Sequence, residues 1–115
     1  MRVFLSGLFL LAIASPAPAQ VDPAYVPCAA CHSLVAGRNG VGPSLNGVVG
    51  RRKAAVPNFS YSPAMKAQKG SWTVAELDSF LANPRAKVPG TRMFYPGQPD
   101  AAKRKQLIQY LQKQK

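Results

Sequence analysis

The sequence predicts a small all-α domain in which short helices are separated by long irregular loops. Apolar residues recur at helical spacing in two segments, residues 74–82 and residues 100–112. No segment alternates apolar and polar residues in the way that a half-buried strand would. Residues 37–50 and 85–99 are rich in glycine and proline, which favours loops. Together these observations favour helices and loops over a sheet.

Two short helices are expected in the first part of the domain. Asp22-Pro23 combines an N-cap residue with a proline suited to the first helical position. Ser62-Pro63 starts a second short helix in the same way, and Gly70 is expected to end it.

Two longer helices are expected in the second part. Thr73 and Glu76 form a capping box at the start of one helix, which Asn83-Pro84 ends. The last helix covers about residues 100–112 and carries apolar residues on one face and lysines on the other. The loop that lies between these two helices is expected to be irregular throughout.

The beginning of the chain has the pattern of an export signal. Arg2 precedes an apolar run of about a dozen residues, and residues 17–19 offer a small-x-small cleavage pattern. The alternative is an uncleaved membrane anchor, but a helix needs roughly 18 to 20 apolar residues to span a bilayer. We therefore expect residues 1–19 to be a signal peptide and residues 20–115 to form one exported, periplasmic domain without stable membrane insertion.

The exported domain is strongly basic. Without Arg2 its formal net charge is +10, against +11 for the full chain. Such a charge favours an acidic partner or membrane face that is met through electrostatic steering. Nucleic acid is the usual alternative, but the export signal and the lack of a nucleic-acid-binding motif argue against it. Arg52 and Lys53 lie in a run of charges and are interpreted as solvated.

The chemistry of the chain is concentrated in the pentapeptide from Cys28 to His32. Cys28 and Cys31 share one face of a helical turn and can reach the two vinyl groups at one porphyrin edge. The imidazole of His32 can then take one axial position on iron. A thioredoxin-like dithiol, half of a zinc site and a disulfide are the alternatives. A thioredoxin-like dithiol lies in a βαβ context, which the sequence around the motif does not predict, and a zinc site needs four ligands, whereas the chain has two cysteines and one histidine. The adjacent histidine argues against a disulfide. We therefore expect one covalent haem c.

The second axial ligand has few candidates. His32 is the only histidine, and the methionines of the exported domain are Met65 and Met93. Met65 has helical spacing in an alanine-rich segment, where methionine usually fills a core. Met93 lies in a Pro/Gly loop far enough from His32 to return over the opposite haem face. We predict a His32/Met93 pair, which raises the reduction potential; ligation by Lys87 is a lesser alternative.

These motifs, in this order, resemble those of the class I cytochromes c, which are small single-haem electron carriers. The segments that carry the resemblance are Cys28–His32, Gly42–Arg51, Phe59–Tyr61, Trp72, Leu81–Pro84, Pro89–Met93 and Leu107–Leu111. The Pro-Gly-Thr-Arg-Met segment matches the axial-methionine loop of that family. The resemblance implies three main short helices wrapped around one covalently attached haem.

The resemblance also implies a function and a set of site residues. The chain would be a soluble periplasmic electron carrier, monomeric and not an enzyme, that cycles between Fe(II) and Fe(III) with transient acidic redox partners. The carbonyl of Pro43 would accept the Nδ1 proton of His32. The residues that would face the haem are Arg51, Tyr61 and Trp72 at a propionate, Leu45, Leu81 and Phe94 as walls, and Thr91 beside the methionine. The basic residues suggested for the rim of the haem edge are Lys53, Lys66, Lys87 and Arg92.

Several alternatives stay open at this point. Tyr61 and Trp72 are equally compatible with a plain aromatic core. The N-terminal helix is shorter than is usual in the family, with Ala24 and Tyr25 as its only visible equivalents, so its contact with the last helix is in question. The rival functions are a haem enzyme or ligand sensor in which Met93 is displaced, and a subunit bound permanently to one oxidoreductase.

Overall fold

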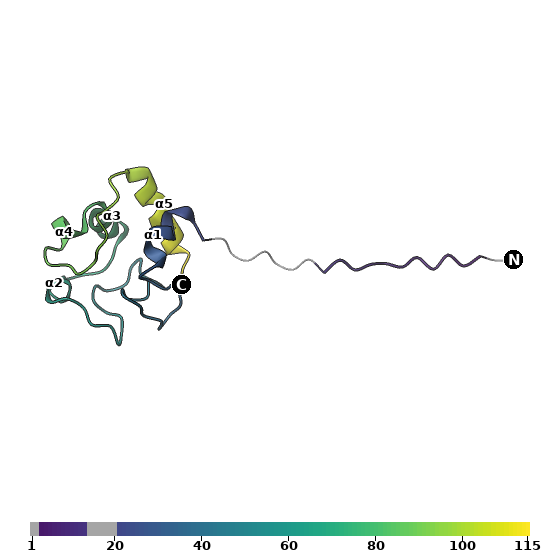
Figure 1. Ribbon diagram of the computed structural model, residues 1–115, viewed down its shortest axis with the longest axis horizontal. Coiled ribbons are helices and arrows are strands. Elements are labelled where there is room, and N and C mark those ends of the chain that lie inside the picture. Colours follow the sequence, from purple (N-terminus) through teal and green to yellow (C-terminus); the bar gives the residue numbers. More distant parts are fainter. Residues whose placement is uncertain (1–2, 14–20) are drawn as a thin grey trace.

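The computed structural model describes residues 3–13 and 21–115. Within these residues the fold consists of short helices and loops, and the single β-pairing among them is an isolated bridge between Arg52 and Ser71. Figure 1 shows the helices gathered in one body, from which residues 3–13 extend away. The predicted all-α class is confirmed.

The domain begins with two helical turns that follow each other directly. The 3-10 turn η1 covers Pro23–Tyr25 and α1 covers Val26–Ala29. The carboxylate of Asp22 accepts a hydrogen bond from the backbone nitrogen of Ala24 at 2.8 Å, so it caps the first turn as expected. These turns place the cysteine motif at the very start of the fold.

Helix α2 covers Pro63–Lys66 and is shorter than the sequence suggested. The hydroxyl of Ser62 caps it by accepting from the nitrogen of Met65 at 3.1 Å. The nitrogen of Gln68 donates to the carbonyl of Met65 at 3.0 Å, a spacing of three residues that tightens and ends the helix before Gly70. Gly70 lies beyond the end of the helix and has a left-handed backbone with φ +81.

Helices α3 and α4 meet at Asn83. Helix α3 covers Val74–Ala82, and the hydroxyl of Thr73 accepts from the nitrogen of Glu76 at 3.2 Å. Asn83 ends α3 with an extended backbone, and its side chain accepts from the nitrogen of Ala86 at 3.2 Å. A further one-turn helix, α4, therefore covers Pro84–Lys87 where the sequence analysis expected an irregular loop.

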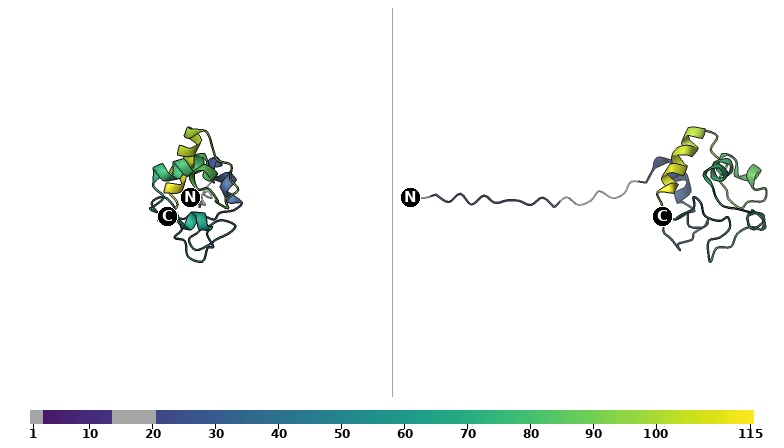
Figure 2. Two further views of the ribbon diagram at one scale, coloured as in Figure 1. Left: turned by 90° about the vertical axis from the view of Figure 1, so that its left-hand side faces the viewer. Right: turned by 180° about the vertical axis from the view of Figure 1, so that it is seen from behind.

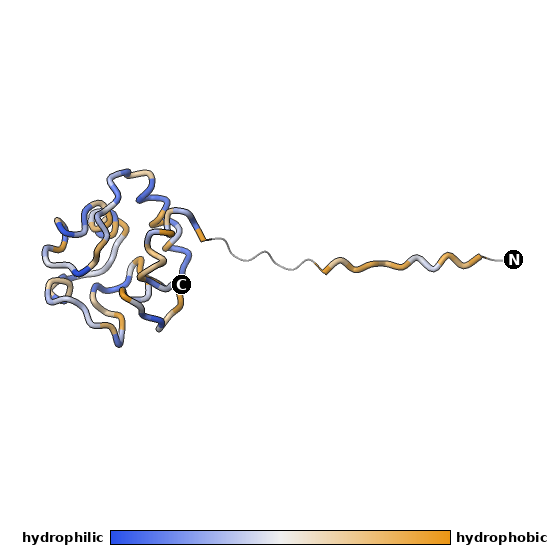
Figure 3. The backbone as a smooth tube through the Cα atoms, in the orientation of Figure 1, coloured by the Kyte–Doolittle hydropathy of each residue, from blue (hydrophilic) through white to orange (hydrophobic). Residues whose placement is uncertain are grey.

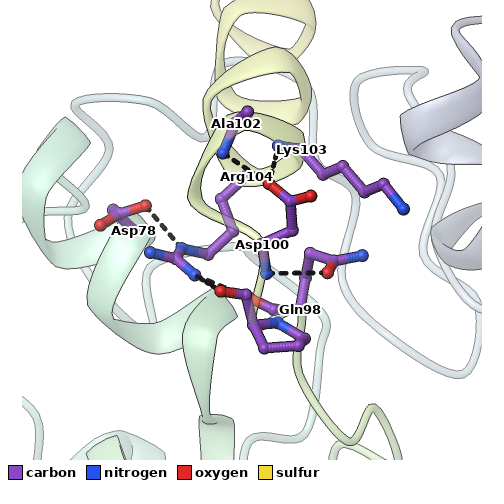
Figure 4. A network of polar contacts seen from close by, with 7 residues as sticks. Asp78, Gln98, Asp100, Ala102, Lys103 and Arg104 are labelled. Carbon is purple, nitrogen blue, oxygen red and sulfur yellow. Dashed lines mark hydrogen bonds and ion pairs between the residues drawn. The ribbon is translucent and has the colours of Figure 1, made fainter.

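Helix α5, which covers Ala101–Gln112, is the longest in the described part of the chain. The carboxylate of Asp100 caps it by accepting from the nitrogens of Ala102 and Lys103 at 2.9 and 3.3 Å. The guanidinium of Arg104 donates to Asp78 of α3 at 2.8 Å and to the carbonyl of Gln98 at 2.8 Å (Figure 4). This network fixes α5 against α3.

The first turns pack against the last helix. The rings of Tyr25 and Tyr110 lie 5.5 Å apart, and η1 and α5 are in direct contact. The right-hand view of Figure 2 shows the blue first turns at the yellow last helix, in line with the contact between η1 and α5. The shortened N-terminal segment therefore keeps the contact with the last helix that the sequence analysis left in question. The buried apolar residues of the core are Tyr25, Cys28, Val48, Trp72, Leu77, Phe80, Leu81, Val88, Leu107, Ile108 and Leu111.

Residues 3–13 are extended and exposed, and Figure 3 shows them as mostly hydrophobic. The predicted cleavage pattern at residues 17–19 lies outside the described residues. The signal peptide of residues 1–19 and the domain of residues 20–115 therefore stay predictions. In the described ranges, no helix combines the length and the apolar character needed to cross a membrane.

Candidate haem site

The cysteine motif is held at the end of α1. Cys28 is buried, Cys31 is exposed, and the two are not joined in a disulfide. The nitrogen of Cys31 and that of His32 both donate to the carbonyl of Cys28, at 3.2 and 3.0 Å, which makes a tight turn. The hydroxyl of Tyr25 donates to the carbonyl of His32 at 3.0 Å. The two thiols and the imidazole are thus presented by one short, anchored segment.

The imidazole of His32 is oriented by Pro43. Its Nδ1 atom lies 2.7 Å from the carbonyl oxygen of Pro43. Because a carbonyl can only accept, Nδ1 carries the proton and the lone pair of Nε2 is left for a metal. Burial, and to a lesser extent the charge of Arg51, lower the pKa of His32, while the bond to Pro43 acts in the opposite direction. Burial therefore favours the neutral form of the ring, which is the form that can bind a metal.

Gly42 lets the loop that carries Pro43 approach the ring, a role that was not predicted from the sequence. The nitrogen of Gly42 donates to the carbonyl of Cys31 at 2.8 Å. A Cβ atom at position 42 would lie only 2.6 Å from Nδ1 of His32. Since real Cβ atoms essentially never come so close to another atom, only glycine fits here. The Gly-Pro pair in a glycine-rich stretch was the signal that could have revealed it.

Arg51 supplies the clearest test of whether an acidic group belongs in this site. Its Nη1 atom donates to the carbonyls of Ser44 and Asn46 at 2.8 and 3.0 Å. Its Nε atom is buried and has no hydrogen-bond partner among the described residues. A buried donor without a partner requires an explanation, and a carboxylate of a bound cofactor would provide one. The residues present therefore fit a haem, and Arg51 would hold one of its propionates.

The other two expected propionate donors lie close to Arg51. Trp72 is paired with this segment, because its nitrogen donates to the carbonyl of Arg51 at 2.8 Å. Tyr61 lies near enough for its hydroxyl to oppose the lowering of the Arg51 pKa that burial causes. The Tyr61 hydroxyl accepts from the nitrogen of Val56 at 3.0 Å, which leaves its own proton available. Trp72 also packs on Phe80, with ring centroids 5.0 Å apart, so it belongs to the aromatic core as well.

The methionine loop is fixed at both ends. The nitrogen of Thr91 donates to the carbonyl of Val88 at 3.0 Å, and the hydroxyl of Thr91 accepts from the nitrogen of Met93 at 3.3 Å. At the far end, the nitrogen of Gln98 donates to the carbonyl of Leu81 at 2.8 Å. The side chain of Met93 is half-buried against the core. Thr91 thus lies beside the methionine backbone.

The alternative thioether, Met65, packs against the same core as Met93. Both are half-buried, so burial alone does not separate them. The difference lies in their settings. Met65 is inside the one-turn helix α2, whereas Met93 lies in the loop that is fixed on α3 and α4.

The three residues that are expected to wall the haem differ in how they pack within the chain. Leu81 is buried, and Leu45 is half-buried against the core. Phe94 is 92% exposed, so the packing of the described residues does not support its expected role as a wall, and that role stays a prediction. Tyr95 packs against the core instead, and burial followed by the nearby Cys28 thiol raises its pKa. Neighbouring side chains of an extended loop point to opposite sides. In this loop the side chains of the odd-numbered residues Met93 and Tyr95 face inward.

Lys53 is buried, which corrects its interpretation as a solvated residue and as part of the basic rim. Its residue exposure is 6%, and its Nζ atom lies 3.2 Å from Oε1 of Glu76 and 4.9 Å from the centroid of the Trp72 ring. Lys87 is half-buried and also pairs with Glu76. Of the four suggested rim residues, Lys66 and Arg92 are exposed.

Comparison with known proteins places this architecture in a family. No protein-family model matches the chain. It is 40% identical to cytochrome c2 of Blastochloris viridis over 118 residues, covering 96% of this chain and 92% of that protein. It is 47% identical to cytochrome c2 of Rhodopila globiformis over 85 residues, covering 74% of this chain and 80% of that protein. A third relative, cytochrome c-type cyt cy of Rhodobacter capsulatus, is 46% identical over 109 residues, but only 54% of its length is matched, against 84% of this chain.

A solved structure agrees with these relatives. Cytochrome cH from Methylobacterium extorquens superimposes with a TM-score of 0.71 at 43% identity, covering 76% of this chain and 89% of that one. The chain belongs to the class I c-type cytochromes. It carries one covalent haem c and is an electron carrier, which confirms the predicted class, cofactor and activity.

Proposed function

We propose that the protein works in the periplasm and passes single electrons between acidic redox proteins, with Cys28 and Cys31 holding the haem and His32 and Met93 as its axial ligands. When bound, the haem supplies a one-electron Fe(II)/Fe(III) couple. The observation that carries this assignment is the hydrogen bond from Nδ1 of His32, which lies four residues after the first cysteine, to the carbonyl of Pro43. It leaves Nε2 of the imidazole free to bind a metal, in the same short segment that carries both cysteines.

The chain's own residues favour fast electron exchange by keeping both ligands in place. Pro43 and Gly42 restrain the imidazole, and contacts with Val88 and Leu81 restrain the loop that carries Met93. A ligand sphere that does not rearrange needs little reorganisation when the charge changes. If His32 and Met93 both bind the iron, they would leave no site for an external ligand. This arrangement is that of a carrier and not of an enzyme.

The charge distribution supports transient acidic partners. All four carboxylates of the domain are engaged within it: Asp22 and Asp100 cap helices, Glu76 pairs with two lysines, and Asp78 pairs with Arg104. The remaining basic side chains give the surface its excess positive charge. An acidic partner would be steered by this field, and salt would screen the attraction.

Addition of carbon monoxide to the reduced protein tests the proposal against its rival. A sealed carrier shows no change in its spectrum, because both axial positions are occupied. Prompt binding would favour a haem enzyme or sensor in which Met93 is displaced. For the partner, we expect the rate of electron transfer to an acidic redox protein to fall as ionic strength rises. A rate that does not depend on salt would contradict docking through charge.

A further inference from the structure

Lys53 places a charged ammonium group inside the protein. Its side chain is 2% exposed, and the group lies over the face of the Trp72 ring, 4.9 Å from the centroid. An ammonium is attracted to the negative face of an indole, and the attraction grows when water is excluded. Burial of a cation is costly unless other groups compensate for the lost hydration. Here the compensation comes from the indole and from Glu76, whose Oε1 lies 3.2 Å from the ammonium.

Glu76 is shared between two lysines. Its second oxygen, Oε2, lies 2.5 Å from Nζ of Lys87. The three side chains form a triad with one net positive charge, buried at the Lys53 end and 29% exposed at the Lys87 end. The backbone of Glu76 is fixed at the start of α3, where its nitrogen donates to the hydroxyl of Thr73. The carboxylate is therefore held at a defined place between the two cations.

The triad joins two parts of the candidate haem site. Lys53 follows Arg51 by two residues, and the backbone of Arg51 pairs with that of Trp72. Lys87 ends α4 and directly precedes Val88, which is completely buried and accepts the first hydrogen bond of the methionine loop. One end of the triad thus lies against the proposed propionate donors, and the other end lies at the start of the segment that leads to the methionine.

We propose that Lys53, Glu76 and Lys87 set the reduction potential of the haem, with buried Lys53 as the dominant positive charge and as the residue that holds the Trp72 ring. The oxidised iron carries one more positive charge than the reduced iron, so a nearby cation disfavours oxidation. This effect is stronger in the protein interior than at the surface, where water reduces it. The inference rests on the proposed function, because it requires a haem beside Trp72.

The test is the reduction potential of the haem-loaded protein in matched variants. Lys53→Met should lower the potential, and Lys53→Arg, which keeps the charge and the stacking, should restore most of it. Lys66→Met is the control, because it removes the same charge from an exposed position on α2. Its effect should be smaller and should disappear at high salt, whereas the effect of Lys53→Met should persist because buried charges are screened much less.

Two results would overturn the proposal. One is a potential of Lys53→Met that equals that of the parent protein, and the other is a shift no larger than that of Lys66→Met. Lys87→Gln carries the test if Lys53→Met does not fold, because it removes the net charge and leaves the Lys53–Glu76 pair intact. Lys87→Gln should lower the reduction potential, and an unchanged potential would contradict the proposed role of the triad.

The failure of this inference can be told apart from that of the proposed function. The absorption spectrum of each preparation reports the attached haem and the iron–sulfur bond before the potential is measured. A parent protein without haem would contradict the proposed function. A loaded Lys53→Met protein with an unchanged potential would contradict the role of the triad alone.

Discussion

A Cβ atom added to Gly42 would lie 2.6 Å from Nδ1 of His32, the nitrogen that donates to the carbonyl of Pro43 at 2.7 Å. The close approach of Gly42 is what allows Pro43 to reach the ring. The orientation of the imidazole therefore depends on the absence of a side chain at one position.

Gly42→Ala should disturb the ligation of the iron by His32 and destabilise the protein. The added methyl group has to displace the imidazole or the loop, and overpacking of this kind typically costs about 1 to 3 kcal/mol. Denaturant unfolding should show the loss, and the visible spectrum should show weakened ligation by His32. Gly50→Ala is the control: position 50 has φ +88 but no neighbour within 4 Å of the added atom, so its cost comes from the backbone and the spectrum should not change. Identical spectra for parent and Gly42→Ala would contradict the assigned role of Gly42.

The ion pairs of Glu76 predict a pH dependence of stability. Hydrogen bonds from Lys87 and then from Lys53 lower the pKa of Glu76 from its ordinary value of 4.5. A carboxyl group whose pKa is lower in the folded state contributes stability that is fully present above the unfolded pKa. This contribution is lost as the pH falls through the folded pKa. The difference in unfolding free energy between the parent and Glu76→Gln should therefore be constant near neutral pH and shrink below pH 4.5, and a difference that is the same at all pH values would contradict the pairing.

Phe94 and Tyr95 should respond in opposite ways to truncation. Phe94 is 92% exposed, so Phe94→Ala should change the free energy of unfolding by less than about 0.5 kcal/mol. Tyr95 packs against the core, so Tyr95→Ala should cost about 1 to 3 kcal/mol. Urea unfolding of the two haem-loaded variants measures both values. A larger loss for Phe94→Ala would contradict this expectation and support Phe94 as a wall of the site.

The helix starts could be predicted because each is encoded by neighbouring residues. The side chains of Asp22, Ser62, Thr73 and Asp100 accept from backbone nitrogens two or three positions later, so a local pattern is sufficient. Helix α4 was missed for a related reason. Asn83 was read only as the end of α3, whereas its side chain also caps the next turn.

The environment of Lys53 could not be predicted from its neighbours. Its partner Glu76 is 23 positions away, and a run of basic residues does not show that one of them faces inward. The same limit applies to Phe94, because the direction of side chains in an irregular loop depends on how the loop is attached at its ends. The cysteine motif could be interpreted because its two thiols and its imidazole are local.

The absorption spectrum of the purified, exported protein tests the central claim most directly, namely that haem bound to Cys28 and Cys31 has His32 and Met93 as axial ligands. We predict a covalently attached c-type haem with a weak near-infrared charge-transfer band from an iron–sulfur bond. The band should disappear in Met93→Leu and remain in Met65→Leu. A colourless protein, or a band that survives Met93→Leu, would contradict the claim.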